Sequence, residues 1–393
     1  MDKYEVLKQY FGYDAFRDGQ EKMIDAITSG RDVLGIMPTG AGKSLCYQIP
    51  ALMAGENGGI TLVISPLISL MKDQVSALNQ AGVHAAYLNS SLTSGQYYKA
   101  LGYAREGRYP IVYVAPERLL TPEFLDFAVH AKIAMVAVDE AHCVSQWGQD
   151  FRPGYLKIEE FLCTLPKRPV VSAFTATATA EVRDDIIDLL KLQDPVVTTT
   201  GFDRPNLYFE VQSPKDKYAA VKTYIEEHAG QCGIVYCLTR KLVEEVTEKL
   251  MKDGFSVTRY HAGLSDSERK QNQEDFIFDM GIDKSNVRFV IHYNMPKNME
   301  SYYQEAGRAG RDGEPADCLL LYGGRDVVTN QMFIDNNRDN EELDDVTRSI
   351  VAERDRELEK DDVLLLYERL PERVYPAVFR GVRKRILRKL FQL

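Results

Sequence analysis

A lysine and a serine follow a loop of small residues near the start of the chain. Residues 37–44 read MPTGAGKS and are named the lysine loop below. They contain Thr39, Gly40, Ala41, Gly42, Lys43 and Ser44. Backbone N–H groups of such a loop surround nucleotide phosphates, and the N-terminus of the following helix favours an anion. Lys43 would contact the β- and γ-phosphates of ATP, and the Ser44 hydroxyl would bind Mg²⁺. Because Met37 replaces the first glycine of the usual pattern, a turn that binds nothing is the alternative.

Two carboxylates follow an apolar run in the middle of the chain. Residues 135–138 are apolar and lead directly into Asp139 and Glu140. Asp139 can hold Mg²⁺, while Glu140 can orient and deprotonate the attacking water. Such a pair at a strand end is more often a helix cap. Together with Lys43 and Ser44 it indicates nucleotide hydrolysis instead.

Aromatic and polar residues upstream of the lysine loop could recognise a base. Tyr13 or Arg17 could stack on adenine, and the Gln20 amide suits the edge of that base. A helix pair joined by a packed aromatic turn is the alternative, and for this segment alone we favour it.

A polar loop with aromatic rings follows the two carboxylates. Residues 145–153 (SQWGQDFRP), named the aromatic loop below, include Gln146, Trp147, Phe151 and Arg152. The two rings can stack on single-stranded bases, worth about 1–3 kcal/mol each, and Arg152 can contact phosphate. Because the loop leaves the strand that holds Glu140, DNA contact there could reposition the catalytic base. Rings anchored in a core would fit poorly with such polar surroundings.

Two arginines near residue 310 could complete a nucleotide site. Arg308 and Arg311 are spaced i and i+3, which predicts that they share one helical face. An arginine directed at the γ-phosphate stabilises transition-state charge by about 10³–10⁵ in rate. Two solvated arginines are the alternative.

The apolar runs that must position these residues alternate with helical patterns. Such runs occur at 32–36, 61–64, 111–114, 135–138 and 170–174, and again at 233–237, 257–260 and 287–292. Each of the first five precedes a polar cluster and then a helical pattern, which predicts an α/β, doubly wound parallel sheet. Ligands bind such sheets at the carboxyl ends of the strands. We expect Pro50 to kink or break the first of these helices, and residues 195–206 to be a crossover with a flexible run at 198–201.

Composition limits the class of protein. The net charge of −10 over 393 residues means that nucleic-acid binding must depend on a local groove. The six cysteines form no C-x-x-C pair, which argues against structural zinc and for a reducing compartment. No signal-peptide pattern or long apolar run occurs, so we expect a cytoplasmic protein that does not contact a membrane.

Several motifs together resemble those of the RecQ family of superfamily 2 DNA helicases, in its bacterial form. They are residues 11–20, 37–44, 65–70, 139–153, 173–177, 201–206, 260–264 and 304–313. The resemblance runs to about residue 326, and the aromatic loop is its most specific part. It implies two RecA-like lobes at 1–200 and 201–335. It further implies ATP- and Mg²⁺-dependent 3′ to 5′ movement on single-stranded and partially duplex DNA, in repair and recombination. By the same resemblance, His142, Thr175, Thr177 and Gln304 contact the γ-phosphate or couple it to DNA.

The sequence departs from that family in two places. After residues 274–277 the family continues with a strand and a glycine-containing loop, whereas residues 278–280 here lead directly to 281–284. Either this is a deletion or a natural stretch is absent from this sequence. We favour the second, since losing an internal strand would expose apolar surface on both neighbours. Residues 336–393 hold no cysteine, so we expect a helical extension without a zinc site. Its basic end at 379–391 is either a DNA-binding helix or, as we favour, a packed terminal helix.

Two other functions remain open at this point. An RNA-directed helicase of the same superfamily would share most of these motifs, although the aromatic loop argues against it. A nucleic-acid-binding module that has lost unwinding would bind a single strand without turning over ATP.

Overall fold

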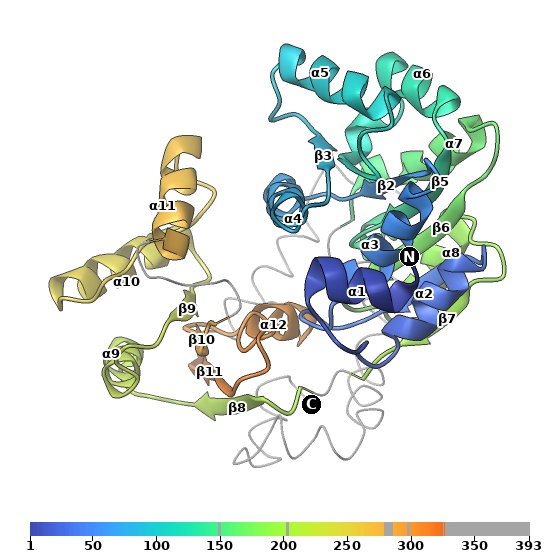
Figure 1. Cartoon of the computed structure of the whole chain (residues 1–393). Helices are drawn as coiled ribbons and strands as arrows, with labels where there is room; N and C mark the ends of the chain where they lie inside the picture. The colour runs from blue at the N-terminus through green and yellow to red at the C-terminus, as the bar shows by residue number, and fades with distance from the viewer. Residues whose placement is uncertain (148–150, 202–203, 279–285, 297–298, 325, 327–393) are drawn as a thin grey trace, which may run out of the picture. The chain divides into compact units, whose positions relative to one another are not determined.

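The computed structural model describes residues 1–147, 151–201, 204–278, 286–296, 299–324 and 326 (Figure 1). The chain divides into two compact units, Met1–Phe202 and Asp203–Leu393, which we describe separately. The predicted extension at 336–393, including its basic end, lies outside the described residues. Among the helices that are described, none is both long and apolar enough to cross a membrane.

The first unit is built on a parallel sheet of seven strands in the order β3-β4-β2-β5-β6-β1-β7. The strands are β1 (Val33–Ile36), β2 (Ile60–Ile64), β3 (Ala85–Leu88), β4 (Ile111–Val114), β5 (Ile133–Val138), β6 (Val170–Thr175) and β7 (Val196–Thr199). Strands β1, β2 and β4 are buried along their whole length, as parallel strands covered on both faces should be. The doubly wound parallel sheet predicted from the sequence is therefore confirmed.

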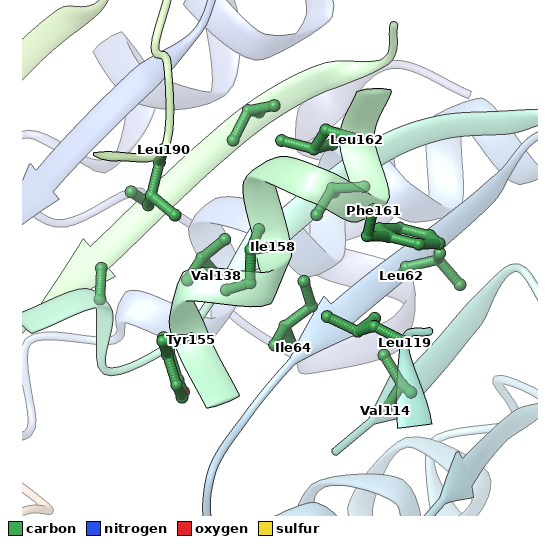
Figure 2. Close-up of a cluster of buried hydrophobic side chains, with 14 of the residues drawn as sticks. Leu62, Ile64, Val114, Leu119, Val138, Tyr155, Ile158, Phe161, Leu162 and Leu190 are labelled. Atoms are coloured by element: carbon green, nitrogen blue, oxygen red, sulfur yellow. The ribbon is translucent and has the colours of Figure 1, made fainter. Parts of the chain in front are cut away.

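Helices cover both faces of this sheet (Figure 1). They are α1 (Lys3–Phe11), α2 (Gln20–Thr28), α3 (Lys43–Gly55), α4 (Ile68–Gln80), α5 (Ser94–Arg105), α6 (Pro122–His130), α7 (Lys157–Thr164) and α8 (Ala180–Leu189), with the 3-10 helices η1 (Pro116–Arg118), η2 (Ala141–Val144) and η3 (Pro153–Leu156). One buried cluster joins the sheet to α1–α4 and the other joins it to α5–α8. Figure 2 shows the second cluster, in which Leu62 and Ile64 of β2 lie with Phe161 of α7. Val63 belongs to the opposite cluster, since successive strand side chains alternate between faces.

Two local predictions for the first unit were wrong in part. Pro50 lies inside α3 and does not break it, since the buried face that includes Ile49 and Ala51 packs the helix onto the sheet, whereas a kink at Pro50 stays a prediction. Of the run predicted to be flexible at 198–201, the first two residues belong to the edge strand β7, which pairs with β1 along its whole length. Its threonines fit that position, because an edge strand need not be apolar throughout.

Asp32 ties together three segments at the amino ends of the strands. Its side chain is buried and accepts hydrogen bonds from both Nη atoms of Arg168, at 3.1 and 2.6 Å. It also accepts from the Val171 N–H at 2.9 Å and the Gln193 N–H at 2.7 Å. One carboxylate thus fixes the start of β1 against the start of β6 and the end of the α8 segment.

We expect Asp32→Ala to lower the free energy of unfolding by about 3 kcal/mol. The substitution leaves buried N–H donors and the Arg168 guanidinium without their acceptor. Urea denaturation of the whole chain would measure this loss. Asp126→Ala removes a more exposed partner of Arg105 and should cost less than about 1 kcal/mol. Equal losses in the two variants would contradict the role given to Asp32.

The second unit also has a parallel sheet, with four strands in the order β8-β11-β10-β9. Its elements are β8 (Leu207–Gln212), α9 (Lys217–Glu227), β9 (Gly233–Tyr236), α10 (Arg240–Lys252), α11 (Asp266–Phe278), β10 (Phe289–His292), α12 (Met299–Ala306) and β11 (Ala316–Leu321). Two parallel-sheet units confirm the predicted α/β class with two lobes. The sequence interpretation overlooked β8 and β11, which pair with each other in this sheet.

The strand predicted at residues 257–260 is wrong. These residues are described but form no strand. In the part of the sheet that is described, β9 is an edge strand and its residues are only half-buried. A single segment without a neighbouring strand cannot form the ladder hydrogen bonds that define a strand. The junction before Gly281 lies outside the described residues, so the explanation of an absent stretch stays a prediction.

Candidate functional site

Three strand ends of the first unit bring most of the predicted residues to one edge of the sheet. Strand β6 lies between β1 and β5, with Ile36 opposite Thr175 and Val138 opposite Ala173. The lysine loop follows β1, Thr175 ends β6, and Asp139 follows β5. Carboxyl ends of neighbouring parallel strands are where such sheets bind ligands.

The lysine loop has a backbone that only glycine adopts easily. Gly40 and Gly42 have φ of 86° and 81°, in the left-handed region. A Cβ added to Gly42 would lie 2.5 Å from Nε2 of Gln20, so a larger residue there would have to displace the Gln20 amide. Lys43 begins α3, and its Nζ donates to the Met37 carbonyl at 3.1 Å, within the loop. Thr39, Ala41 and Ser44 are half-buried in the same segment.

Gln20 and Arg17 hold this loop from outside. Gln20 accepts from the Arg17 N–H at 2.8 Å and donates to the carbonyls of Ala41 and Gly42, both at 3.1 Å. The Arg17 guanidinium donates to the Gly40 carbonyl at 2.5 Å. Helices α1 and α2 form the helix pair of the alternative that we favoured, but Tyr13 in the turn between them is exposed and not packed. In this arrangement the Gln20 amide bonds to the protein, and its recognition of adenine stays a prediction.

Asp139 is a buried carboxylate next to a second carboxylate. Burial and the adjacent Glu140 charge raise the pKa of Asp139 to about 7, against the opposing effect of Lys43. Its Oδ1 accepts from the Glu140 N–H at 3.1 Å. Glu140 has φ of 49°, a strained backbone that concentrates at functional positions. Carboxylate and hydroxyl oxygens are the ligands that Mg²⁺ prefers, so Asp139 and Ser44 suit that ion chemically.

His142 joins Glu140 to the end of β6. Its Nδ1 lies 2.9 Å from the Thr175 hydroxyl and 3.5 Å from Oε2 of Glu140. The Thr175 hydroxyl donates in turn to the Thr177 carbonyl at 2.9 Å. The structure therefore brings these residues, named only by family resemblance, into one hydrogen-bonded chain.

The described ends of the aromatic loop are anchored while its side chains stay accessible. Trp147 is 39% exposed, Gln146 is exposed and Phe151 is half-buried. The Trp147 N–H donates to the Ser145 hydroxyl at 3.1 Å, and Arg152 donates to the Pro66 carbonyl at 3.3 Å. An exposed ring suits stacking on a base more than anchoring in a core.

In the second unit, the prediction that Arg308 and Arg311 share a helical face is wrong. Helix α12 ends at Ala306, and both arginines lie in the turn beyond it. Gly310 has φ of 53°, a left-handed conformation that suits a turn and not a helix interior. Gln304 is half-buried on the last turn of α12.

Arg204 fixes the turn at residues 307–311, which contains Arg308 and Arg311 and is named the arginine turn below. The sequence interpretation missed this role. Its guanidinium donates to the carbonyls of Gly307, Ala309 and Gly310 at 2.8, 2.9 and 2.5 Å. Only the resemblance of residues 201–206 to a family motif pointed to this residue, because its partners lie about a hundred positions away in the sequence.

Arg311 is a half-buried cation next to other cations. Burial lowers its pKa, and the charges of Arg308 and Arg204 lower it further. Its Nε is buried and has no hydrogen-bond partner among the described residues. An uncompensated guanidinium of this kind is suited to binding an anion such as a phosphate.

Comparisons with known proteins agree with this geometry. The family models for DEAD/DEAH box helicase and for Helicase conserved C-terminal domain match residues 17–186 and 216–313. The chain is 47% identical over 349 residues to ATP-dependent DNA helicase RecQ of Bacillus subtilis, covering 86% of this chain and 58% of that protein. It is 46% identical over 336 residues to the protein of the same name from Pasteurella multocida, covering 82% and 52%.

Solved structures with the same fold are more distant in sequence. DEAD-box helicase Mss116 bound to ssRNA and UDP-BeF has a TM-score of 0.69 at 18% identity, covering 90% of this chain and 80% of that one. DUF1998 helicase MrfA bound to DNA has a TM-score of 0.67 at 18% identity, covering 86% and 53%. At this identity the likeness shows the fold alone.

The chain spans about half the length of the curated RecQ proteins that it matches. Within that half, the identity of 43–47% to bacterial RecQ proteins extends over most of the chain and over both matched helicase models. By its sequence and its two parallel-sheet units, the chain belongs to the RecQ family of superfamily 2 helicases.

Proposed function

We propose that this chain is the motor part of an ATP-dependent DNA helicase. The observation that carries the proposal is the meeting of Lys43, Asp139 and Thr175 at three neighbouring strand ends of the first unit. The lysine loop binds the phosphates of ATP, and ATP hydrolysis drives 3′ to 5′ movement along one DNA strand. Unwinding of partially duplex DNA, and roles in repair and recombination, follow from family membership.

The residues divide the ATPase work as follows. Lys43 and the loop N–H groups bind the triphosphate, while Ser44 and Asp139 would hold Mg²⁺. That ion, when bound, would neutralise phosphate charge. Glu140 accepts the proton of the attacking water, and His142 with Thr175 connects this base to the end of β6. We further propose that Gln304, Arg308 and Arg311 act on the same triphosphate.

The aromatic loop is the proposed DNA sensor. The exposed Trp147 ring and the Phe151 ring would stack on single-stranded bases, with Gln146 and Arg152 as polar contacts. Contact there would speed hydrolysis through the segment that connects the loop to Glu140. The cytoplasmic location expected from the sequence stays a prediction, as do the roles of Tyr13 and Arg17 with adenine.

Comparing ATP hydrolysis with single-stranded DNA and with single-stranded RNA tests this function. We expect DNA to stimulate the wild-type chain strongly and RNA weakly, and Lys43→Ala to abolish hydrolysis with either. The variant also measures any contaminating ATPase. Equal, slow hydrolysis by both proteins with DNA present would leave only a nucleic-acid-binding module. Stronger stimulation by RNA would identify an RNA-directed helicase instead.

A further inference from the structure

Tyr155 connects the segment after the aromatic loop to the backbone of Asp139. Its side chain is fully buried, and its hydroxyl donates to the Asp139 carbonyl at 2.8 Å. Figure 2 shows the Tyr155 ring in the buried cluster that contains Val138 and Ile158. Because packing fixes the Tyr155 ring, its hydroxyl holds the Asp139 carbonyl in a defined position.

Both described ends of the aromatic loop are tied to secondary structure. At its start, the Ser145 hydroxyl donates to Asp185 of α8 at 2.6 Å. At its end, the Arg152 carbonyl accepts from the Tyr155 N–H at 2.8 Å, within the turn that begins η3. A shift of Arg152, whose own N–H donates to the Cys143 carbonyl of η2 at 2.9 Å, would therefore reach Tyr155 through one short turn.

We propose that Tyr155 is a positioning residue that couples the aromatic loop to Asp139. The inference rests on the proposed function, since it names the route between the DNA sensor and the magnesium ligand. The Tyr155 hydroxyl bonds to the carbonyl of Asp139, the residue whose carboxylate would hold the ion. A shift of Tyr155 would therefore shift that residue. The coupling must be reciprocal in binding free energy, so nucleotide with Mg²⁺ near Asp139 would change the affinity for DNA by the same factor by which DNA changes the affinity for nucleotide.

The single tryptophan of the chain reports on the loop without any turnover. Trp147 lies on the loop and is 39% exposed, so its emission responds to changes in loop position. The probe is AMP-PNP, a non-hydrolysable ATP analogue, with Mg²⁺. We expect it to change Trp147 emission in the wild type, and we expect Tyr155→Phe to reduce that change about tenfold. Equilibrium dialysis should still detect bound nucleotide in the variant.

Tyr97→Phe is the matched control. It also removes one buried phenolic hydroxyl from the first unit, on α5, where the ring packs against Arg118. We expect its emission change to equal that of the wild type. Thermal unfolding of both variants would show that each is folded at the temperature of the measurement.

Stimulation by DNA provides the second readout. Tyr155→Phe should lower the ratio of DNA-stimulated to basal hydrolysis about tenfold, as loss of one buried hydrogen bond would, with unchanged affinity for single-stranded DNA in the absence of nucleotide. A wild-type emission change and wild-type stimulation in this variant would overturn the proposal. So would a wild type whose Trp147 does not respond to nucleotide. Failure of the proposed function gives a different result from these two. The wild type would then not hydrolyse ATP, whether or not its Trp147 emission responds to nucleotide.

Discussion

Glu140→Gln is expected to lower DNA-stimulated ATP hydrolysis by about 10²–10⁴-fold while nucleotide still binds. The substitution keeps the size of the side chain but removes the base that accepts the proton of the attacking water. The strained backbone of Glu140, with φ of 49°, places this side chain beside Asp139 and within 3.5 Å of His142. Steady-state hydrolysis with single-stranded DNA, together with binding of labelled nucleotide, measures both parts of the expectation.

Glu160→Gln is the control for that experiment. It makes the same chemical change on the exposed face of α7 in the same unit. We expect hydrolysis within about twofold of the wild type, since exposed substitutions usually change little. If Glu140→Gln also hydrolyses ATP at the wild-type rate, Glu140 is not the base, and the assignment of the carboxylate pair fails.

The extent to which the fold was predictable follows from burial. Runs such as 111–114 and 135–138 were identifiable because a strand covered on both faces is apolar throughout. The edge strand β7 (Val196–Thr199) was missed because its threonines imitate a loop. Residues 257–260 have an apolar and β-branched pattern but lack a paired neighbour among the described strands. Pairing is a tertiary property that the local pattern does not contain.

The candidate site was predictable to the same degree. The ATPase residues were predictable from their types and spacing, because phosphate and metal binding need the groups that Lys43, Ser44, Asp139 and Glu140 carry. Tyr155 does not, since its partner is a backbone carbonyl and any buried tyrosine has the same local pattern. For the arginine turn, the i, i+3 spacing suggested a helix, whereas Gly310 and the Arg204 bonds form a turn.

Arg308→Ala and Arg311→Ala are expected to lower DNA-stimulated ATP hydrolysis by about 10³-fold or more each. An arginine that meets the charge developing on the transferred phosphoryl group contributes about 10³–10⁵ in rate. The two differ in surroundings, because Arg308 is exposed whereas Arg311 has a buried Nε without a partner among the described residues. Arg311→Lys keeps the charge but loses the planar fork, so we expect it to restore little activity.

Arg240→Ala and Arg204→Ala separate this effect from general loss of charge or of structure. Arg240 is exposed at the start of α10, so its variant should hydrolyse ATP at close to the wild-type rate. Arg204 holds three carbonyls of the arginine turn, so its loss should lower both hydrolysis and the thermal midpoint. The variants of Arg308 and Arg311 should lower hydrolysis alone, because anion-binding groups do not support the turn. Wild-type rates of hydrolysis in both Arg308→Ala and Arg311→Ala would mean that these arginines bind another ligand. A different group would then have to stabilise the transition-state charge.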